Sequence, residues 1–367
     1  MGETSDILII GGGIAGVSAG AELARDASVT VLEAETQLGY HSTGRSAAIF
    51  IRNYGNATLR KLNAMAHPAL SGQSGGESVL SPRGELLVVQ EHELDTLDAY
   101  LEGTDSVERV SAEEAMALVP ILRRDRIAAA VIERDAQDID VDRLLQGYAR
   151  ALRERKGRIA TGERIETIAR DGDGWRVETT GRTYGARLLV DAAGAWADEV
   201  AKMAGLPPIG IQPMRRSAVL MPVPEDVGPV GDWPLFGSVV EGEGWYAKPE
   251  GDKLMISPAD EDPVEPHDAW PDDMVVAEGL YRFEQMVDLP IVKPTHSWAG
   301  LRSFAPDRTP VVGFDPLVDG FFWLAGQGGY GVQTAPALAA ITRALCTGGG
   351  SDVDQSVTKA LSPERLR

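Results

Sequence analysis

The glycine-rich segment near the start of the chain limits the possible folds more than any other part of the sequence. Residues 6–10 contain the continuous apolar run of residues 7–10, which is typical of a buried parallel strand. Gly11, Gly13 and Gly16 then fill the glycine positions of a G-x-G-x-x-G motif at the start of an expected helix. Residues 29–33 are expected to form a second strand. The segment therefore predicts one β-α-β unit of a Rossmann-like nucleotide-binding domain.

This unit predicts a dinucleotide at the N-terminus of its helix, beside Ile14 and Ala15. The first glycine allows a tight turn, the second lets the backbone approach a pyrophosphate, and the third lets the helix pack closely on the strand. Free N–H groups and the helix dipole favour an anion there. Glu33, followed by Ala34, is placed to accept hydrogen bonds from ribose hydroxyls. A glycine-rich turn in another α/β protein is the alternative interpretation, and the motif alone does not separate FAD from NAD.

Two further segments favour FAD. Residues 39–48 form a small polar loop able to donate hydrogen bonds to phosphate and ribityl oxygens. Residues 326–333 again present backbone amides at a helix start, which suits the pyrimidine end of a flavin. The residues predicted to contact the cofactor are Gly11, Gly13, Ile14, Ala15, Gly16, Glu33, Ala34, His41, Ser42, Thr43, Arg45, Ser46, Ala47, Ala48, Gly194, Trp196, Arg302, Gly328, Gly329, Tyr330, Gly331, Gln333 and Thr334.

The order of the expected elements predicts two domains. Residues 187–191 are expected to form another buried strand. Strands separated by Gly, Pro and acidic turns occupy residues 217–258, and a strand at residues 321–325 and a helix follow near the end of the chain. We expect the α/β class in an α+β two-domain arrangement, with a Rossmann-like FAD-binding domain built from discontinuous segments and an antiparallel-sheet substrate domain. The FAD-binding domain takes residues 1–85, 138–210 and 296–367, and the substrate-binding domain takes residues 86–137 and 211–295.

Local signals predict where several elements begin and turn. Ser111 and Glu114 form a capping box that opens a short helix, which stops at Pro120. Asp140 is expected to be the N-cap of a longer helix. The Asp-Gly-Asp-Gly run at residues 171–174 predicts the turn of a hairpin.

Charge and cysteine content exclude several classes of function. The formal net charge is −20, so the chain repels polyanions and no nucleic-acid partner is expected. Cys346 is the only cysteine, which excludes an internal disulfide and a cysteine metal cluster, and the five histidines show no metal-ligand spacing. No stretch approaches the roughly 20 apolar residues of a membrane-spanning helix, and the N-terminus is short and polar. We expect a cytoplasmic protein, monomeric or dimeric, without a metal.

The same blocks of sequence resemble the D-amino-acid oxidase/dehydrogenase (DAO) superfamily of FAD enzymes, which includes glycine and sarcosine oxidases. The resemblance lies in residues 39–48, 212–218, 259–268, 298–304 and 327–333, and it covers nearly the whole chain. Within the superfamily these blocks are most similar to bacterial D-arginine dehydrogenases. The resemblance implies noncovalent FAD, because Cys346 lies far in sequence from the segment where sarcosine oxidases attach their flavin.

The resemblance also assigns a site for the carboxylate of an amino acid. Arg302 matches the arginine that holds the substrate carboxylate, and a guanidinium is the natural bidentate partner of that group. Arg216 matches a second arginine of the D-arginine enzymes. Arg215 and Arg216 point opposite ways if they lie on a strand, so only one of them faces the pocket, and we expect it to be Arg216. Tyr246 matches a tyrosine whose hydroxyl reaches the same carboxylate.

Three further matches concern the rest of the substrate. Tyr54 matches a tyrosine at the pocket mouth, and Gly329 matches a residue whose carbonyl accepts from the substrate amine. Glu85 matches the acid that the D-arginine enzymes offer to the guanidinium group. Ile49 and Phe50 depart from the histidine and tyrosine of those enzymes, so the wall is more apolar here and strict arginine specificity is in doubt.

The activity implied is oxidative deamination of D-amino acids such as D-Arg, D-Lys and D-Met. A hydride passes from Cα of the neutral-amine substrate to flavin N5, and the imino acid hydrolyses to a 2-oxo acid and ammonia. The electron acceptor, whether quinone, dye or O2, stays open. One alternative is an FAD oxidase or dehydrogenase of glycine, sarcosine or a 2-hydroxy acid, although Glu85 disfavours an anionic side chain. A second alternative is a non-catalytic flavin-binding protein.

Overall fold

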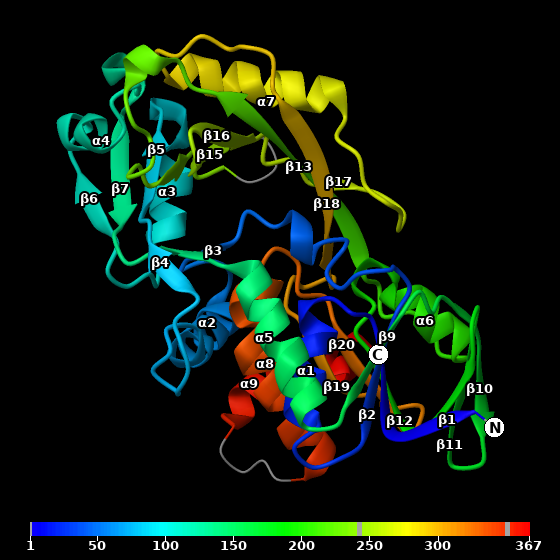
Figure 1. The fold of residues 1–367 in the computed structure, drawn as a ribbon. Helices are drawn as coiled ribbons and strands as arrows, with labels where there is room; N and C mark the ends of the chain where they lie inside the picture. The colour runs from blue at the N-terminus through cyan, green and yellow to red at the C-terminus, as the bar shows by residue number, and fades with distance from the viewer. Residues whose placement is uncertain (1, 241–243, 349–352) are drawn as a thin grey trace.

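The computed structural model describes residues 2–240, 244–348 and 353–367, and two large sheets organise them (Figure 1). The helices of this part of the chain are α1 (Ile14–Leu23), α2 (Ala57–Leu70), α3 (Leu94–Leu101), α4 (Ala112–Leu118), α5 (Val141–Glu154), α6 (Ala197–Met203), α7 (Asp273–Met286), α8 (Gly331–Thr347) and α9 (Gln355–Leu361). None of the described helices is long and apolar enough to cross a membrane.

The first sheet contains the nucleotide-binding motif. Its strands are β1 (Glu3–Ile10), β2 (Val29–Glu33), β9 (Arg158–Thr161), β10 (Ile165–Asp171), β11 (Gly174–Thr179), β12 (Thr183–Asp191), β19 (Val311–Phe314) and β20 (Phe321–Ala325). Strands β9, β2, β1, β12 and β20 pair in parallel in that order, and β10, β11 and β19 add antiparallel pairs. The expected Rossmann-like fold, with segments from both ends of the chain in one sheet, is confirmed.

Helix α1 packs on the parallel sheet and contacts its neighbours α5 and α8 (Figure 1). Close packing depends on glycines along one side of the helix. A Cβ at Gly16 would collide with the carbonyl oxygen of Gly11, and a Cβ at Gly20 would lie 3.0 Å from Val31 of β2. Because Gly16 and Gly20 have no side chains, α1 can pack closely on the sheet, as the third position of the motif requires.

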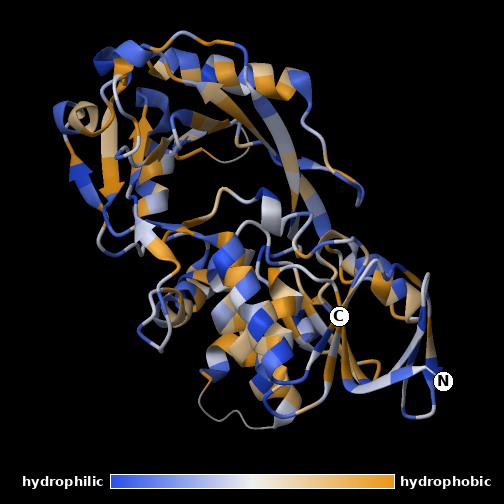
Figure 2. Ribbon diagram, in the orientation of Figure 1, coloured by the Kyte–Doolittle hydropathy of each residue, from blue (hydrophilic) through white to orange (hydrophobic). Residues whose placement is uncertain are grey.

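The second sheet is mainly antiparallel. Its strands are β5 (Glu85–Val89), β6 (Glu108–Val110), β7 (Ala129–Glu133), β13 (Gln212–Pro222), β14 (Leu235–Gly237), β15 (Tyr246–Glu250), β16 (Lys253–Ser257), β17 (Asp262–Pro263) and β18 (His296–Phe304). Within this sheet, β14 and β5 are the only pair of described strands that run in parallel. Helix α7 packs across the sheet over an aromatic cluster in which the rings of Trp245 and Phe283 lie 5.3 Å apart. Figure 2 shows apolar and polar residues alternating along α7, as expected for a helix with one buried side.

A small sheet connects the two large ones. It consists of β3 (Ile49–Phe50), β8 (Gln137–Ile139) and β4 (Leu80–Pro82). Asp138 of β8 accepts from Arg83 Nε (2.7 Å) and from Lys248 Nζ (3.1 Å), and Lys248 is buried on β15. The division of the chain into domains stays a prediction. Strand β18, which that division assigns to the FAD-binding part, pairs along its whole length with β13 of the second sheet.

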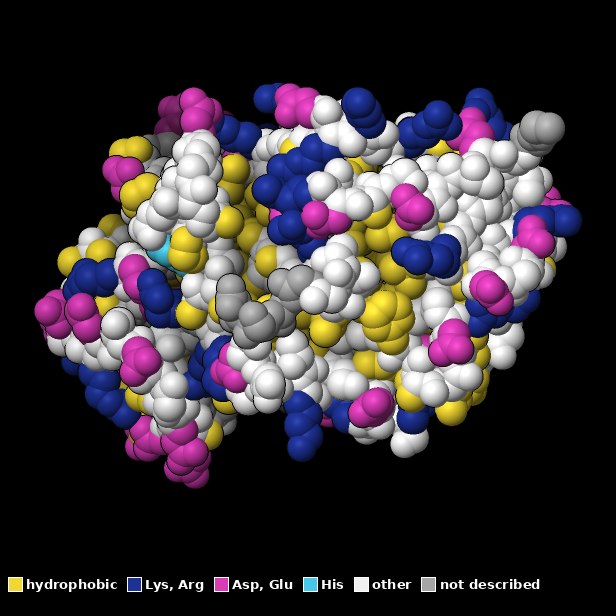
Figure 3. All heavy atoms as spheres, turned by 90° about the horizontal axis from the view of Figure 1, so that it is seen from below, with side chains coloured by type: hydrophobic (Ala, Val, Ile, Leu, Met, Phe, Trp, Pro, Cys, Tyr) yellow, Lys and Arg dark blue, Asp and Glu magenta, His cyan; other side chains and the backbone are white. Residues whose placement is uncertain are grey.

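The local sequence signals agree with the structure. Ser111 and Glu114 form the capping box of α4, and the Asp140 side chain caps α5 by accepting from Arg143 N at 2.9 Å. Residues 171–174 lie at the turn between β10 and β11. Figure 3 shows acidic and basic side chains interspersed on the face seen from below, so the acidic excess of the chain coexists there with many basic groups.

Candidate active site

A cavity of about 940 Å³ lies between the two large sheets, within the range of cofactor and substrate sites. Its wall combines residues of β1, α1 and β2 with residues of β13, β15 and β18. The structure brings the predicted site residues together in this wall, apart from Gly16, Gln333 and Thr334. The glycine motif and the predicted carboxylate clamp (Arg216 and Arg302) therefore share one cavity.

The three exceptions have partners inside the packing of the helices. Gly16 lies against the backbone of Gly11, as described above. Gln333 donates from Nε2 to Asn63 Oδ1 at 2.7 Å, so its carboxamide joins α8 to α2. Thr334 donates to a main-chain carbonyl one turn earlier (2.8 Å). The side chains of Gln333 and Thr334 therefore stabilise the packing of α8 and do not line the cavity.

The glycine loop requires its residue types for steric reasons. Gly11 has φ +110°, and a Cβ there would collide with the carbonyl oxygen of Ala192. Gly13 is the N-cap of α1 and has no capping side chain of its own. Thr43 Oγ1 accepts from Ile14 N at 3.0 Å, which ties the polar loop to the first turn of the helix. The N-terminus of α1 thus opens into the cavity with its backbone exposed to a ligand.

Glu33 lies at the end of β2 with its carboxylate held by main-chain groups. Oε2 accepts from Gly12 N and Oε1 from Glu35 N, both at 2.8 Å. Each carboxylate oxygen has a second lone pair, so the group can still accept from ribose hydroxyls. His41 also lines the cavity, with Nε2 3.1 Å from Glu35 Oε1 and its ring 4.7 Å from that of Trp196.

The polar loop of residues 39–48 is fastened to β18. Ser42 Oγ donates to the Leu301 carbonyl at 2.6 Å. Arg45 Nη1 donates to the carbonyls of Ala269 and Ala299 at 3.1 and 3.0 Å, and Nη2 pairs with Asp268. The guanidinium of Arg45 thus joins the loop to the second sheet, while its stem lines the cavity.

Strained backbone gathers around the cavity. Five non-glycine residues of the described chain have positive φ, and Ala48 (57°), Ala259 (54°) and Arg308 (58°) all lie in the cavity wall. Such conformations cost of order 1–2 kcal/mol for a residue with a Cβ. They persist where surrounding contacts hold them, and they concentrate at functional sites.

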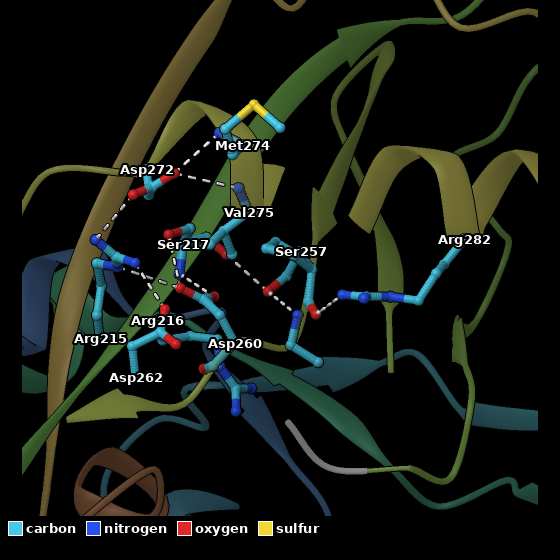
Figure 4. A network of polar contacts seen from close by, with 12 residues as sticks. Arg215, Arg216, Ser217, Ser257, Asp260, Asp262, Asp272, Met274, Val275 and Arg282 are labelled. Carbon is cyan, nitrogen blue, oxygen red and sulfur yellow. Dashed lines mark hydrogen bonds and ion pairs between the residues drawn. The ribbon is translucent and has the colours of Figure 1, made fainter. Parts of the chain in front are cut away.

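The carboxylate clamp results from the register of two strands. Arg216 of β13 pairs with Gly300 of β18, and Arg302 follows two residues later, opposite Met214. Because side chains alternate along a strand, Arg216 and Arg302 are diagonal neighbours on one face of the ladder. Arg215 lies on the other face, where it pairs with Asp262 at 2.6 Å (Figure 4). Of these two adjacent arginines, Arg216 is the one in the cavity wall.

Of the clamp arginines, Arg302 is buried and Arg216 is partly buried, and polar partners hold both. Arg302 Nη2 donates to Tyr54 Oη at 2.5 Å, and its guanidinium lies so close to Gly329 that no Cβ would fit there. Burial acts against the charge of Arg302, but Tyr54 and Glu261 outweigh it and raise the pKa of Arg302 above its ordinary value, so the guanidinium stays cationic. Arg216 Nε donates to the Asp260 carbonyl at 2.8 Å, and its guanidinium lies 5.9 Å from the Tyr246 ring.

Glu85 provides an acidic group in the same cavity. It lies on β5 directly opposite Glu133 of β7, and both side chains are buried. Burial and the neighbouring charge of Glu133 raise the pKa of Glu85 to about 8. Tyr100 Oη lies 3.5 Å from Glu85 Oε2. Glu133 accepts from Asn53 Nδ2 at 2.6 Å, so that carboxylate has a partner that Glu85 does not share.

Sequence reasoning missed two charged residues of the clamp. Glu261 Oε1 accepts from Arg302 Nη1 at 2.9 Å and from Arg216 Nη2 at 3.2 Å. Arg308 donates to both oxygens of Glu261 and lines the cavity beside Phe304. Glu261 stands in an acidic turn, where a glutamate is usually solvated, so only its place in a block shared with the superfamily could have drawn attention to it.

The residues present fit a bound FAD. One connected wall contains the amide end of α1, the Glu33 carboxylate at the end of β2 and the backbone turn at residues 326–331. These groups suit a pyrophosphate, a ribose and a flavin ring in turn. Cys346 lies on α8 outside the wall, and burial raises the pKa of its thiol to about 12, so it offers no thiolate to a flavin.

Comparison with known proteins agrees with this geometry. Residues 6–345 match the family described as DAO, FAD dependent oxidoreductase. The chain belongs to the DAO family. It is 24% identical to hydrogen cyanide synthase subunit HcnC of Pseudomonas aeruginosa, over 91% of this chain and 90% of that protein. It is also 24% identical to glycine oxidase of Geobacillus kaustophilus, over 90% of each chain.

Solved structures share the fold of this DAO-family protein. The glycine oxidase of Geobacillus kaustophilus superposes with a TM-score of 0.82 and 23% identity, over 97% of this chain and 98% of that chain. L-proline dehydrogenase from P. horikoshii superposes with a TM-score of 0.83 and 22% identity, over 100% of this chain and 98% of that chain. At these identities the likeness concerns the fold. The family match makes the protein an FAD-dependent oxidoreductase.

Proposed function

We propose that this enzyme oxidises free amino acids at Cα, and that it prefers D-amino acids with cationic or large apolar side chains, such as D-Arg, D-Lys and D-Met. The observation that carries the proposal is the pair of the partly buried Arg216 and the buried Arg302 on one face of the β13–β18 ladder, inside the cavity that holds the glycine loop. Two largely buried guanidiniums that share one carboxylate partner suit a substrate carboxylate. The sequence resemblance to D-arginine dehydrogenases supports the D configuration.

Each residue of the clamp has a defined task in the proposed reaction. Arg302 and Arg216 bind the substrate carboxylate, with the hydroxyls of Tyr54 and Tyr246 beside them, and the Gly329 carbonyl accepts from the substrate amine. The bound FAD supplies the hydride acceptor at its N5. Holding carboxylate and amine together orients the Cα–H bond, which is the protein's main contribution to the rate. The imino acid product takes up water and releases ammonia and a 2-oxo acid.

Glu85 supports a preference for cationic side chains. Its carboxyl is buried beside Glu133, and its pKa of about 8 means that it is largely protonated at neutral pH. A guanidinium or ammonium group would pair with the ionised form and lower that pKa again. A neutral side chain would meet an uncharged acid, which explains why D-Met also fits this proposal.

The experiment is an anaerobic substrate panel on the purified, FAD-loaded enzyme. We expect D-Arg, D-Lys and D-Met to bleach the visible absorbance of the flavin, with L-enantiomers inactive. Air is then admitted to learn whether O2 restores the colour or whether a quinone or dye is required. A flavin that stays oxidised with every D-amino acid would refute the proposal.

A second candidate is oxidation of glycine or an N-methylated glycine, favoured by the names of the relatives glycine oxidase and dimethylglycine dehydrogenase. The clamp would serve these substrates equally well, since they carry the same carboxylate. Glu85 would then have no role in binding, so the two candidates differ in the effect of Glu85→Gln. Bleaching by glycine or sarcosine, but by no larger amino acid, would decide for the second candidate.

A further inference from the structure

We propose that Glu261 is a positioning residue of the carboxylate clamp, and that it weakens the attraction of this site for a second carboxylate on the substrate. The inference rests on the proposed function, because it concerns the same end of the cavity. It adds a specificity-determining residue that has no direct contact with the substrate.

The contacts of Glu261 place it behind three arginines. Its Oε1 accepts from Arg302 (2.9 Å), Arg308 (3.0 Å) and Arg216 (3.2 Å), and its Oε2 accepts from Arg308 at 2.9 Å. All three guanidiniums belong to residues of the cavity wall, whereas Glu261 does not. The Glu261 side chain is only 12% exposed. A substrate would therefore meet the arginines, and the arginines meet Glu261.

The backbone around Glu261 is held in place on both sides. Asp260 Oδ1 accepts from Ser217 N at 2.7 Å and Oδ2 from Ser217 Oγ at 2.9 Å, so the preceding residue is pinned to β13. Asp262 pairs with Arg215 in the short ladder of β17 (Figure 4). Ala259 completes the bend with a φ of 54°. A carboxylate on such a fixed bend can orient the guanidiniums that it contacts.

Charge gives Glu261 its second effect. Three guanidiniums and one carboxylate carry a formal charge of +2, and loss of the carboxylate would raise it to +3. Charges in a buried site are weakly screened, so each additional positive charge attracts a dianion about twice as strongly as a monoanion. Glu261 therefore lowers the preference of the clamp for ligands with two adjacent carboxylates over ligands with one.

The test measures binding without turnover. Benzoate and phthalate share a ring and differ by one carboxylate, and neither can reduce a flavin. Each is titrated into FAD-loaded wild type, Glu261→Gln, Glu261→Asp and Asp262→Asn, with the flavin absorbance as signal. We expect Glu261→Gln to shift the ratio of the two Kd values about tenfold in favour of phthalate. Glu261→Asp keeps the charge and should retain most of the wild-type ratio.

Asp262→Asn is the matched control. It removes one negative charge from the next residue, which pairs with Arg215 on the opposite face of the strand. We expect the wild-type ratio in this variant. An equal shift in Asp262→Asn and Glu261→Gln, or no shift in Glu261→Gln, overturns the inference. Absence of any benzoate or phthalate binding in wild type also overturns it, since the clamp itself would then be missing.

Arg308→Gln tests the same idea without touching Glu261, in case Glu261→Gln loses FAD. It removes one positive charge, so we expect phthalate to weaken relative to benzoate, and an unchanged ratio counts against the inference. Arg308 is partly exposed, so the shift should be smaller than tenfold. The proposed reaction and the role of Glu261 can be contradicted independently. If no amino acid bleaches the flavin but the ratio of the benzoate and phthalate Kd values shifts as expected, only the proposed reaction is refuted.

Discussion

The two ends of the cavity are built in different ways. The cofactor end consists mainly of main-chain groups at the end of a parallel sheet, supplied by the βαβ unit and by the turn at residues 326–331 near the other end of the chain. The substrate end consists of charged side chains from β5, β13, β18 and the bend before β17. A backbone site depends on shape, and a side-chain site depends on charge balance.

This difference predicts how each end responds to mutation. A side chain at Gly11 or Gly16 of the glycine loop would meet fixed backbone atoms, so such a substitution should abolish the site. A substitution among the arginines or acids leaves the fold in place and changes the electrostatics, so it should alter affinity, selectivity or pH dependence. We therefore expect the largest effect from a substitution in the glycine loop and smaller effects from substitutions of the charged residues.

The largest effect is expected from Gly11→Ala, which should abolish FAD binding. Gly11 has φ +110°, and the added Cβ would collide with the Ala192 carbonyl oxygen. The ratio of flavin absorbance to protein absorbance measures the loss. The control is Gly147→Ala on α5, where a Cβ meets no atom within 4 Å and alanine favours the helix by about 1 kcal/mol. Full FAD content in Gly11→Ala would show that the loop tolerates a side chain.

Arg302→Met should lower kcat/KM for every substrate about 10³-fold, mostly through KM. The change removes one guanidinium from the clamp and leaves Glu261 with one partner fewer, and loss of one member of a buried charged pair costs roughly 2–5 kcal/mol. Steady-state kinetics with D-Met provide the measurement. Arg215→Met on the opposite strand face is the control, and we expect little change there. Kinetics of Arg302→Met close to wild type would remove Arg302 from carboxylate binding.

Glu85→Gln should lower kcat/KM for D-Arg and D-Lys at least tenfold more than for D-Met. The pH dependence follows from the pKa of about 8 in the free enzyme. Ionised Glu85 favours a cationic substrate, so the D-Arg to D-Met ratio of kcat/KM should rise as pH increases through about 8. The amine of the substrate titrates in both reactions and cancels in the ratio. A D-Arg to D-Met ratio that changes neither with pH nor with Glu85→Gln would contradict cation recognition by Glu85.

The smallest effect concerns stability. The pKa of Glu85 rises from 4.5 to about 8 on folding, so the folded state binds the proton more tightly. The contribution of Glu85 to the free energy of unfolding is therefore constant below about pH 4.5. It decreases as the pH rises from there to about 8, and above that pH it stays at its lowest value. Glu85→Gln should raise Tm by several degrees at pH 9 and hardly at pH 5, with the exposed change Glu91→Gln as control. An equal rise in Tm at both pH values would indicate that the substitution acts through packing and not through the ionisation of Glu85.

Much of the fold could be predicted because its signals are short-range. Residues 29–33 were expected as the second strand of the β-α-β unit and residues 321–325 as a later strand, and they form β2 and β20 with the same bounds. The strand expected at residues 187–191 extends back to Thr183, because pairing with both β1 and β11 continues there. Strand pairing is a long-range property, which explains why element ends were the less predictable part.

The sequence by itself determined the nucleotide-binding loop, since three glycines, a strand and an acid at set spacing leave few conformations open. Only the tertiary structure decided the charges at the substrate end. Glu85 differs from a solvated glutamate because the fold buries it and because β7 places Glu133 opposite it. Glu261 matters because three arginines distant in sequence converge on it. Electrostatic energy depends on distance and dielectric surroundings, and folding sets both.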